Sequence, residues 1–299
     1  MIDKTKKGIF FAILAAALYA LNAPFSKLLL AHVPSTLMAG LLYLGAGLGM
    51  LAVFGAKRIR GQGTGEEGLT RRELPYTVAM VVLDIAAPIF LLMGLNATTA
   101  ANVSLLNNFE IVATALIALA VFREQISPRL WGGILFVTVS CMILTVDDLS
   151  GLRFSVGSLF VLIACVCWGI ENNCTKRLSH KDPLQIVLIK GLCSGTGSLI
   201  IGFCLKERFR DLWAVPLVLC VGFVAYGLSI FFYVHAQRIL GAARTGAYYA
   251  VAPFIGTLLS LVIFRQVPSY TYFIALALML VGAWLSATDD PIFRLRRKE

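Results

Sequence analysis

Charged residues are scarce in this sequence, and their scarcity excludes an ordinary soluble domain. Only 14% of the 299 residues are Asp, Glu, Lys or Arg, whereas a soluble globular chain carries about 25%. Only three histidines are present, all near the ends of apolar segments. The H-E-x-x-H, G-x-S-x-G and G-x-x-x-x-G-K-[ST] motifs are absent, so the sequence predicts no metalloprotease, serine hydrolase or P-loop nucleotidase activity. We therefore predict a protein that is not an enzyme.

The cysteines lack the spacing of a metal or redox site. The sequence has seven of them, each in or at the end of an apolar segment, and no C-x-x-C or C…H zinc pattern. Free cysteine often packs as a small apolar side chain. We therefore predict neither a metal nor any other cofactor.

Apolar residues are abundant instead. They make up 59% of the chain, and the mean hydropathy is +0.83. Lipid leaves a backbone only helices or closed barrels, and the alternating segments of a barrel are missing. About 20 apolar residues span a bilayer as a helix, and ten segments are long enough: 8–30, 35–56, 74–95, 100–122, 129–147, 155–178, 183–204, 212–238, 243–264 and 269–288. The sequence predicts an all-α polytopic membrane protein with ten transmembrane helices.

Basic residues predict the orientation. With the N-terminus placed in the cytoplasm, nineteen of the 26 Lys and Arg residues fall in inner loops and ends, and six fall outside. Cytoplasmic loops are enriched in Lys and Arg. The net charge of +10 is thereby explained without a nucleic-acid partner. We expect both termini to be cytoplasmic and the protein to lie in the cytoplasmic membrane.

The chain also repeats itself weakly. A shift of 149 residues places Tyr19 on Trp168, Ser26 on Thr175 and Pro34 on Pro183. Two halves of five helices follow, one over residues 1–150 and the other over 151–299. Because five is odd, the halves enter the membrane from opposite sides as inverted repeats. This architecture is typical of secondary transporters, whose site lies near the midplane between the halves.

Two segments carry a family resemblance: GLNATTAANVSLLNNFEIVATALIALAVFREQIS (94–127) and AQRILGAARTGAYYAVAPFIGTLLSLVIFRQVPS (236–269). The sequence resembles the drug/metabolite transporter superfamily, in its ten-helix EamA-like branch. The resemblance implies ATP-independent transport of small metabolites, such as amino acids, or drugs. It also implies that helices 1, 3, 4, 6, 8 and 9 surround the cavity, and that helices 5 and 10 are peripheral, where a homodimer could form. The fourth helix has Glu110-Ile111 where Glu-Pro is common, so no break is expected there.

Three carboxylates lie inside predicted spans: Asp84, Glu110 and Glu171. Ionisable groups at this depth are costly and usually face a cavity or a partner. Lys190 or Lys27 could pair with one of them, and Lys190 could instead extend to the inner surface. The acids outnumber the cations at this depth, so at least one acid is left for a proton or a cationic substrate.

Amides and aromatic rings accompany these acids on the same helix faces. Trp168, Glu171 and Asn172 are spaced for one face, and so are Asn107 and Glu110. The rings could contact a ligand or simply pack within the protein, and His235 is expected to be a hydrogen-bonded boundary residue. The predicted substrate-binding residues are Tyr19, Asn22, Asp84, Asn107, Glu110, Trp168, Glu171, Asn172, Tyr226 and Tyr249.

Glycine and proline predict where helices approach closely or bend. Gly45-x-x-x-Gly49 and Gly191-x-x-x-Gly195 permit tight helix contacts. Pro24 follows Asn22 closely and can kink its helix beside a polar group. The close contacts and the kink are compatible with helices that move during transport and equally with a static arrangement.

Several functions compete at this point. The leading hypothesis is a secondary active transporter for an amino-acid-like zwitterion or an organic cation, which works by alternating access with protons as a candidate coupling ion. The alternative is an uncoupled facilitative carrier or a multidrug or amine exporter of the same fold. A passive pore is less favoured because no selectivity-filter sequence is present. The expected partners are the small-molecule substrate and membrane lipid.

Overall fold

The computed structural model describes residues 2–59, 67–122, 127–148, 153–178, 181–240, 245, 248–265 and 268–287. Seven stretches in this part of the chain are helical, apolar and at least 18 residues long: Thr5–Leu29, Ser35–Gly55, Arg71–Ala97, Ala100–Val121, Val156–Thr175, Leu184–Cys204 and Ala214–Tyr233. Shorter apolar helices cover Pro128–Leu144, Ala252–Phe264 and Tyr270–Leu285. The helical membrane class is confirmed. The count of ten spans stays a prediction, because these three shorter helices are too short to establish it.

The elements of the first half are almost entirely helical. They are α1 (Ile2–Ala20), α2 (Asn22–Leu29), α3 (Ser35–Ile59), the 3-10 turn η1 (Arg71–Glu73), α4 (Leu74–Ala97), α5 (Ala100–Leu106), α6 (Phe109–Phe122) and α7 (Pro128–Thr145). A short antiparallel ribbon follows, formed by β1 (Val146–Asp148) and β2 (Arg153–Phe154). It joins the two halves at the end of the bundle where α7 ends.

The second half is also helical. It contains α8 (Val156–Leu178), α9 (Pro183–Ile189), the π-helical turn η2 (Lys190–Ser194), α10 (Gly195–Cys204), α11 (Ala214–Gly222), the π-helical turn η3 (Phe223–Leu228), α12 (Ser229–Leu240), α14 (Ala252–Phe264) and α15 (Tyr270–Ala287). The π turns lie inside long stretches of helix. Such turns change the direction of the side chains that follow them, and they are frequent at functional sites.

Two long helices of the first half are interrupted near polar residues. The first break separates α1 from α2 at Leu21, close to Pro24, which has no N–H to donate to the preceding turn. The second separates α5 from α6 at Asn107 and Asn108. The expectation of an unbroken helix here is wrong. Asn108 donates its backbone N–H to the Leu105 carbonyl at 3.0 Å, and not to the residue four positions back.

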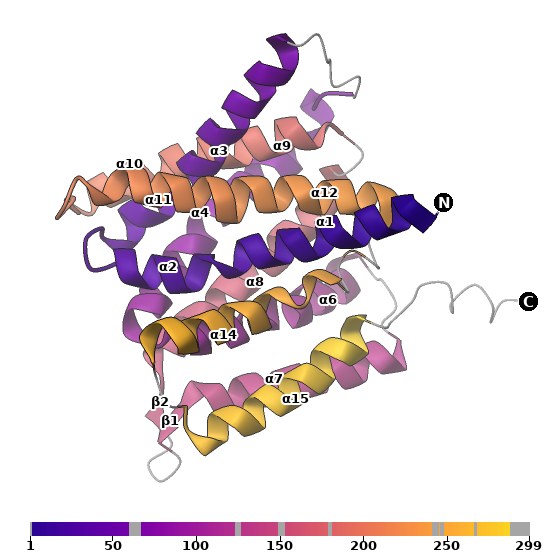
Figure 1. The fold of residues 1–299 in the computed structure, drawn as a ribbon, viewed down its shortest axis with the longest axis vertical. Coiled ribbons are helices and arrows are strands. Elements are labelled where there is room, and N and C mark those ends of the chain that lie inside the picture. Colours follow the sequence, from indigo (N-terminus) through magenta and orange to yellow (C-terminus); the bar gives the residue numbers. More distant parts are fainter. Residues whose placement is uncertain are drawn as a thin grey trace, which may run out of the picture.

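The most extensive helix contacts join the first half of the chain to the second. α4 lies along α8, α1 lies along α12, and α7 lies along α15 at one edge of the bundle (Figure 1). The peripheral position of α7 and α15 agrees with the family resemblance. On α7, Leu135 and Met142 are 62% and 64% exposed. Large apolar side chains that face outward from a membrane helix are expected to contact lipid tails.

Helix α3 approaches the second half so closely that only glycine fits at some positions. A Cβ on Gly45 would lie 2.1 Å from the Leu219 carbonyl oxygen of α11. A Cβ on Gly191 would lie 2.4 Å from the Gly47 Cα. The close contacts predicted for the glycine pairs are therefore present. They join α3 of the first half to α10, α11 and both π turns of the second.

Candidate functional site

A buried ion cluster joins α4, α8 and η2. Lys190 Nζ lies 2.5 Å from Glu171 Oε1 and 3.4 Å from Asp84 Oδ2. The Tyr43 hydroxyl donates to Asp84 Oδ1 at 2.9 Å, and the Thr175 hydroxyl donates to Glu171. Asp84 and Glu171 are only 1% and 3% exposed. One ammonium therefore serves two carboxylates, and the cluster carries a formal charge of −1 when all three groups are ionised.

The helix pairing explains why these residues meet. α4 and α8 pack along each other, which brings Asp84 and Glu171 to one interface. Lys190 enters from the second half, where α9 passes into the π turn η2. The expectation that Lys190 extends to the inner surface is wrong, because its ammonium is held by the two acids. The alternative prediction, that it pairs with a buried acid, is confirmed.

Glu110 is bound differently from the other two acids. It lies in the first turn of α6, where the positive end of the helix dipole stabilises a carboxylate. Asn172 Nδ2 donates to Glu110 Oε1 at 2.6 Å and also approaches Thr114 Oγ1 at 3.3 Å. Glu110 forms no ion pair with any described residue. It is the one carboxylate of the three that has an amide partner in place of a cation.

A group of tyrosines lies beside these acids. The Tyr226 ring centroid is 5.1 Å from that of Tyr43 and 6.0 Å from that of Tyr19. Tyr249 lies 6.0 Å from Tyr19 and 4.9 Å from Tyr233. These rings come from α1, α3, η3, α12 and the helical residues just before α14. They form an aromatic wall with hydroxyl groups on it, and the wall is built from both halves of the chain.

Asn22 links the break in the first helix to this wall. Its Nδ2 donates to the Tyr226 hydroxyl at 3.1 Å, and its Oδ1 accepts from the Ser26 hydroxyl at 2.9 Å. The Ser229 and Tyr249 hydroxyls lie 3.4 Å apart. Asn22 and Tyr226 therefore sit in one polar network, as members of the predicted set.

Trp168 and Asn107 are placed less clearly at the site. Trp168 is 5% exposed and packs in the main apolar core. Asn107 is buried, and its Oδ1 accepts no hydrogen bond from the residues that the structure describes; the same holds for Asn108 Oδ1. The break between Asn107 and Glu110 also removes the continuous helix on which their shared face was predicted. The roles of Trp168 and Asn107 in binding stay predictions.

Tyr43 is the contact that sequence reasoning missed. A tyrosine in an apolar segment is usually an interface residue or part of the packing. Tyr43 lies eight residues after the start of α3, near the middle of the apolar stretch Ser35–Gly55, and it is only 4% exposed. That depth was the available signal, because a tyrosine hydroxyl buried in hydrocarbon needs a partner.

Lys27 and His235 lie at defined positions away from the ion cluster. Lys27 pairs with no acid among the residues that the structure describes: its Nζ donates to the Leu95 carbonyl at 2.5 Å and to the Thr98 carbonyl at 2.8 Å. His235 Nδ1 lies 2.9 Å from the Phe231 carbonyl oxygen, which agrees with the predicted boundary role. The side chain of Arg238 and all of Arg244 lie outside the described residues.

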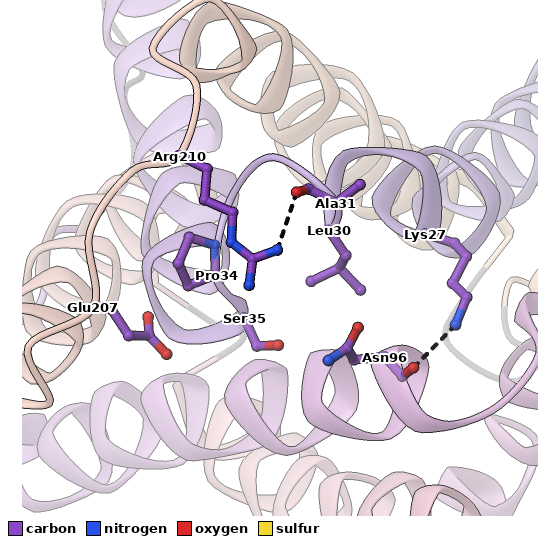
Figure 2. Close-up of a pocket in the computed structure, with 8 residues that line it drawn as sticks. All are labelled: Lys27, Leu30, Ala31, Pro34, Ser35, Asn96, Glu207 and Arg210. Carbon is purple, nitrogen blue, oxygen red and sulfur yellow. Dashed lines mark hydrogen bonds between the residues drawn. The ribbon is translucent and has the colours of Figure 1, made fainter.

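A cavity of about 420 Å³ lies at the end of the bundle where α2 joins α3, and not at the carboxylates. Figure 2 shows Lys27 and Asn96 on one side of this cavity and Arg210 and Glu207 on the other. The residues that line it are Lys27, Leu30, Ala31, Pro34, Ser35, Asn96, Glu207 and Arg210. Of the carboxylates of the predicted site, Asp84 and Glu171 are buried among side chains and Glu110 is half-buried.

Comparisons with known proteins agree with this architecture. A model of the EamA-like transporter family matches residues 6–146 and again residues 155–288. An uncharacterized transporter of Methanothermobacter thermautotrophicus is 26% identical over 294 residues, which cover 93% of this chain and 85% of the relative. The uncharacterized transporter YwfM of Bacillus subtilis is 26% identical over 146 residues, 48% of this chain and 49% of the relative. A solved protein crystal structure covers 99% of this chain and 98% of its own, with a TM-score of 0.67 and 19% identity, which supports the fold alone.

Proposed function

The chain belongs to the EamA-like transporter family, and from that premise we propose that it carries a small amine-bearing metabolite across the cytoplasmic membrane by alternating access. It is a multi-pass membrane transporter and not an enzyme. The proposal concerns the substrate class, the coupling and the mechanism. An amino-acid-like zwitterion leads, and an organic cation follows.

The observation that carries the proposal is the charge balance of the buried acids. Lys190 forms ion pairs with both Asp84 and Glu171, while Glu110 has the amide of Asn172 as its partner. Glu110 is half-buried, and a carboxylate that is partly removed from water without a counter-ion is costly, so Glu110 favours a partner that brings a positive charge. A protonated amine and a proton both meet this need. Competition between them for Glu110 would couple substrate movement to the proton gradient.

The tyrosine wall supports an amine as the substrate group. Cations are attracted to the faces of aromatic rings. The ring centroid of Tyr19 lies 6.0 Å from that of Tyr226 and 6.0 Å from that of Tyr249. Their hydroxyls and the Asn22 amide add donors and acceptors for a polar substrate. The remaining predicted residues, Trp168 and Asn107, belong to this proposal as untested members of the site.

The mechanism follows from the arrangement of the two halves. The family model matches twice, once in each half, and the five helices predicted for each half would make the halves inverted repeats. Helix α3 of the first half packs tightly on α10 and α11 of the second half. These three helices are therefore suited to moving together as one rigid body. The bias of basic residues supports cytoplasmic termini.

Transport into proteoliposomes would test the function. The purified protein is reconstituted, and uptake of radiolabelled L-amino acids and simple amines is measured with and without a pH gradient. We expect gradient-driven uptake of at least one probe, and we expect Glu110→Gln to reduce it by 10-fold or more. Glu73→Gln is the matched control, because Glu73 only caps the exposed turn η1.

Different outcomes separate the alternatives. Saturable uptake that ignores the pH gradient but still depends on Glu110 would support an uncoupled facilitative carrier. Transport of ethidium in place of every amino acid would support an exporter of amphipathic cations. Single-channel currents, or uptake that is unaffected by Glu110→Gln, would contradict the proposed mechanism.

A further inference from the structure

The buried cluster has no cation available for the carboxylate of a zwitterion. Lys190 Nζ already faces Glu171 Oε1 at 2.5 Å and Asp84 Oδ2 at 3.4 Å. A further carboxylate placed beside Glu110 would add an anion to a buried, acid-rich region, which is strongly unfavourable. The cluster therefore suits the amine of a zwitterion and provides no cation for its carboxylate.

The cavity at the junction of α2 and α3 offers such a cation. Its volume of about 420 Å³ lies within the range of about 300–1,000 Å³ that is usual for small-molecule sites. Its wall contains two cations, Lys27 and Arg210, and one acid, Glu207. Ser35 and Asn96 add neutral polar groups. A net positive wall with one acid on it is complementary to a small zwitterion.

Only one of the two cations has unused donors. Lys27 Nζ donates to three backbone carbonyls, at 2.5, 3.3 and 2.8 Å, and an ammonium has three N–H donors. Arg210 donates one side-chain hydrogen bond, from Nη1 to the Ala31 carbonyl at 3.2 Å, and a guanidinium has five donors. Arg210 forms no ion pair within the described ranges. Its planar fork matches the two oxygens of a carboxylate.

Glu207, the acid on the same wall, uses one of its two carboxylate oxygens as a hydrogen-bond acceptor. Glu207 Oε2 accepts the Leu37 backbone N–H at 3.0 Å, which leaves its second oxygen facing no donor in the part of the chain that the structure describes. Glu207 and Arg210 are three residues apart and do not pair with each other. The Arg210 guanidinium can therefore bind a carboxylate of a ligand, and the Glu207 carboxylate can bind an ammonium group. Figure 2 shows both side chains at the same side of the cavity.

The backbone that carries these two residues is held in place. The N–H groups of Arg210 and Asp211 both donate to the His32 carbonyl, at 3.2 and 3.4 Å. His32 Nδ1 lies 2.8 Å from Asp211 Oδ2. These contacts join the loop between α10 and α11 to the loop between α2 and α3. A site that is ordered before binding loses less entropy when the ligand arrives.

We infer that this cavity is a second ligand site, which binds an amino-acid-like zwitterion with its carboxylate on Arg210 and its ammonium on Glu207. The inference rests on the proposed function, because the ligand is the same substrate class on its way to or from the tyrosine wall. Helix α2 connects the two sites. Asn22 bonds to Tyr226, and Leu30, eight residues later, lines the cavity, a separation of about 12 Å along a helix.

Matched probes test the inference on the purified full-length protein in detergent. Each pair is an L-amino acid and the amine that remains when its carboxylate is removed: L-alanine with ethylamine, L-leucine with 3-methylbutylamine, and L-phenylalanine with 2-phenylethylamine. The half-saturating concentration is measured by calorimetry for wild type, Arg210→Gln and Arg208→Gln. Arg208 is exposed on the same loop and does not line the cavity.

We expect Arg210→Gln to raise the half-saturating concentration of the amino acids by 10-fold or more and to leave that of the amines unchanged. Arg208→Gln should change neither. Arg210→Lys keeps the charge and loses the fork, so it should weaken amino-acid binding by a smaller factor. If Arg210→Gln fails to fold, Arg210→Lys decides, since its ammonium can still donate to the Ala31 carbonyl.

Two results would overturn the inference in distinguishable ways. If Arg210→Gln and Arg210→Lys bind amino acids as wild type does, while Glu110→Gln weakens all probes, the second site is refuted and the proposed function stands. If wild type binds none of the six probes, both the proposed substrate class and the second site are refuted.

Discussion

Replacement of Lys190 by methionine should be the most damaging single change in the ion cluster. The ammonium faces two carboxylates, Asp84 and Glu171, that are 1% and 3% exposed. Removal of one member of a buried ion pair costs about 3–5 kcal/mol, because the remaining charge is left without compensation. Here two charges lose their partner, so we expect the upper part of that range. Met keeps most of the side-chain volume, which limits the loss of packing.

Thermal unfolding in detergent would measure this loss. At about 2–4 °C per kcal/mol, the scale for domains of about 150–250 residues, Lys190→Met should lower the midpoint by about 10 °C or more. Lys181→Met is the matched control. Lys181 Nζ lies 3.1 Å from Glu67 Oε2; the Lys181 side chain is 9% exposed and that of Glu67 is 82% exposed. Water can therefore solvate the carboxylate that loses its partner, and the lost pair should cost about 0–1 kcal/mol.

The reasoning also predicts a rescue. A buried ion cluster replaced in full by neutral groups is often no less stable than the original. The triple variant Asp84→Asn, Glu171→Gln, Lys190→Met should therefore recover at least half of the loss caused by Lys190→Met alone. Equal midpoints for Lys190→Met and Lys181→Met would refute the buried ion cluster. A loss that the triple variant does not relieve would show that packing, and not charge, causes it.

Two further predictions concern α3. Tyr43→Phe removes the hydroxyl that donates to Asp84 at 2.9 Å, and it should cost about 1.5–3 kcal/mol; a midpoint equal to that of wild type would contradict the contact. Gly45→Ala should be strongly destabilising because its Cβ would meet a backbone oxygen at 2.1 Å, whereas Gly55→Ala, with nothing within 4 Å, should be neutral or stabilising. Similar midpoints for the two glycine variants would contradict the close packing of α3.

Much of the architecture could be predicted because it depends on local composition. Hydrocarbon penalises every unpaired backbone group, so each long apolar stretch must be a helix whatever its neighbours are. The structure confirms the helical class, and Glu171 lies at the inward-facing position that its depth in the segment indicated. The glycines of α3 likewise marked close contacts before any partner was known.

The arrangement of partners could not be predicted in the same way. Three acids and two lysines in the spans allowed several pairings, and the choice depends on how each helix is rotated about its axis. The π turn at Lys190 and the break at Asn107 and Asn108 shift those rotations. Neither distortion has a reliable signature in a single sequence. The break at Asn107 and Asn108, for example, contains no proline.

Hydropathy and charge are properties of a segment, so the order of residues alone settles that the chain is helical, membrane-embedded and rich in buried acid. Which carboxylate forms an ion pair with the lysine depends on the relative positions of several helices. Only the packed structure assigns Lys190 to Asp84 and Glu171, leaves Glu110 to an amide, and places Arg210 on the wall of a cavity. The physical reason is that side chains meet within a few ångströms, a scale set by helix rotation and backbone breaks.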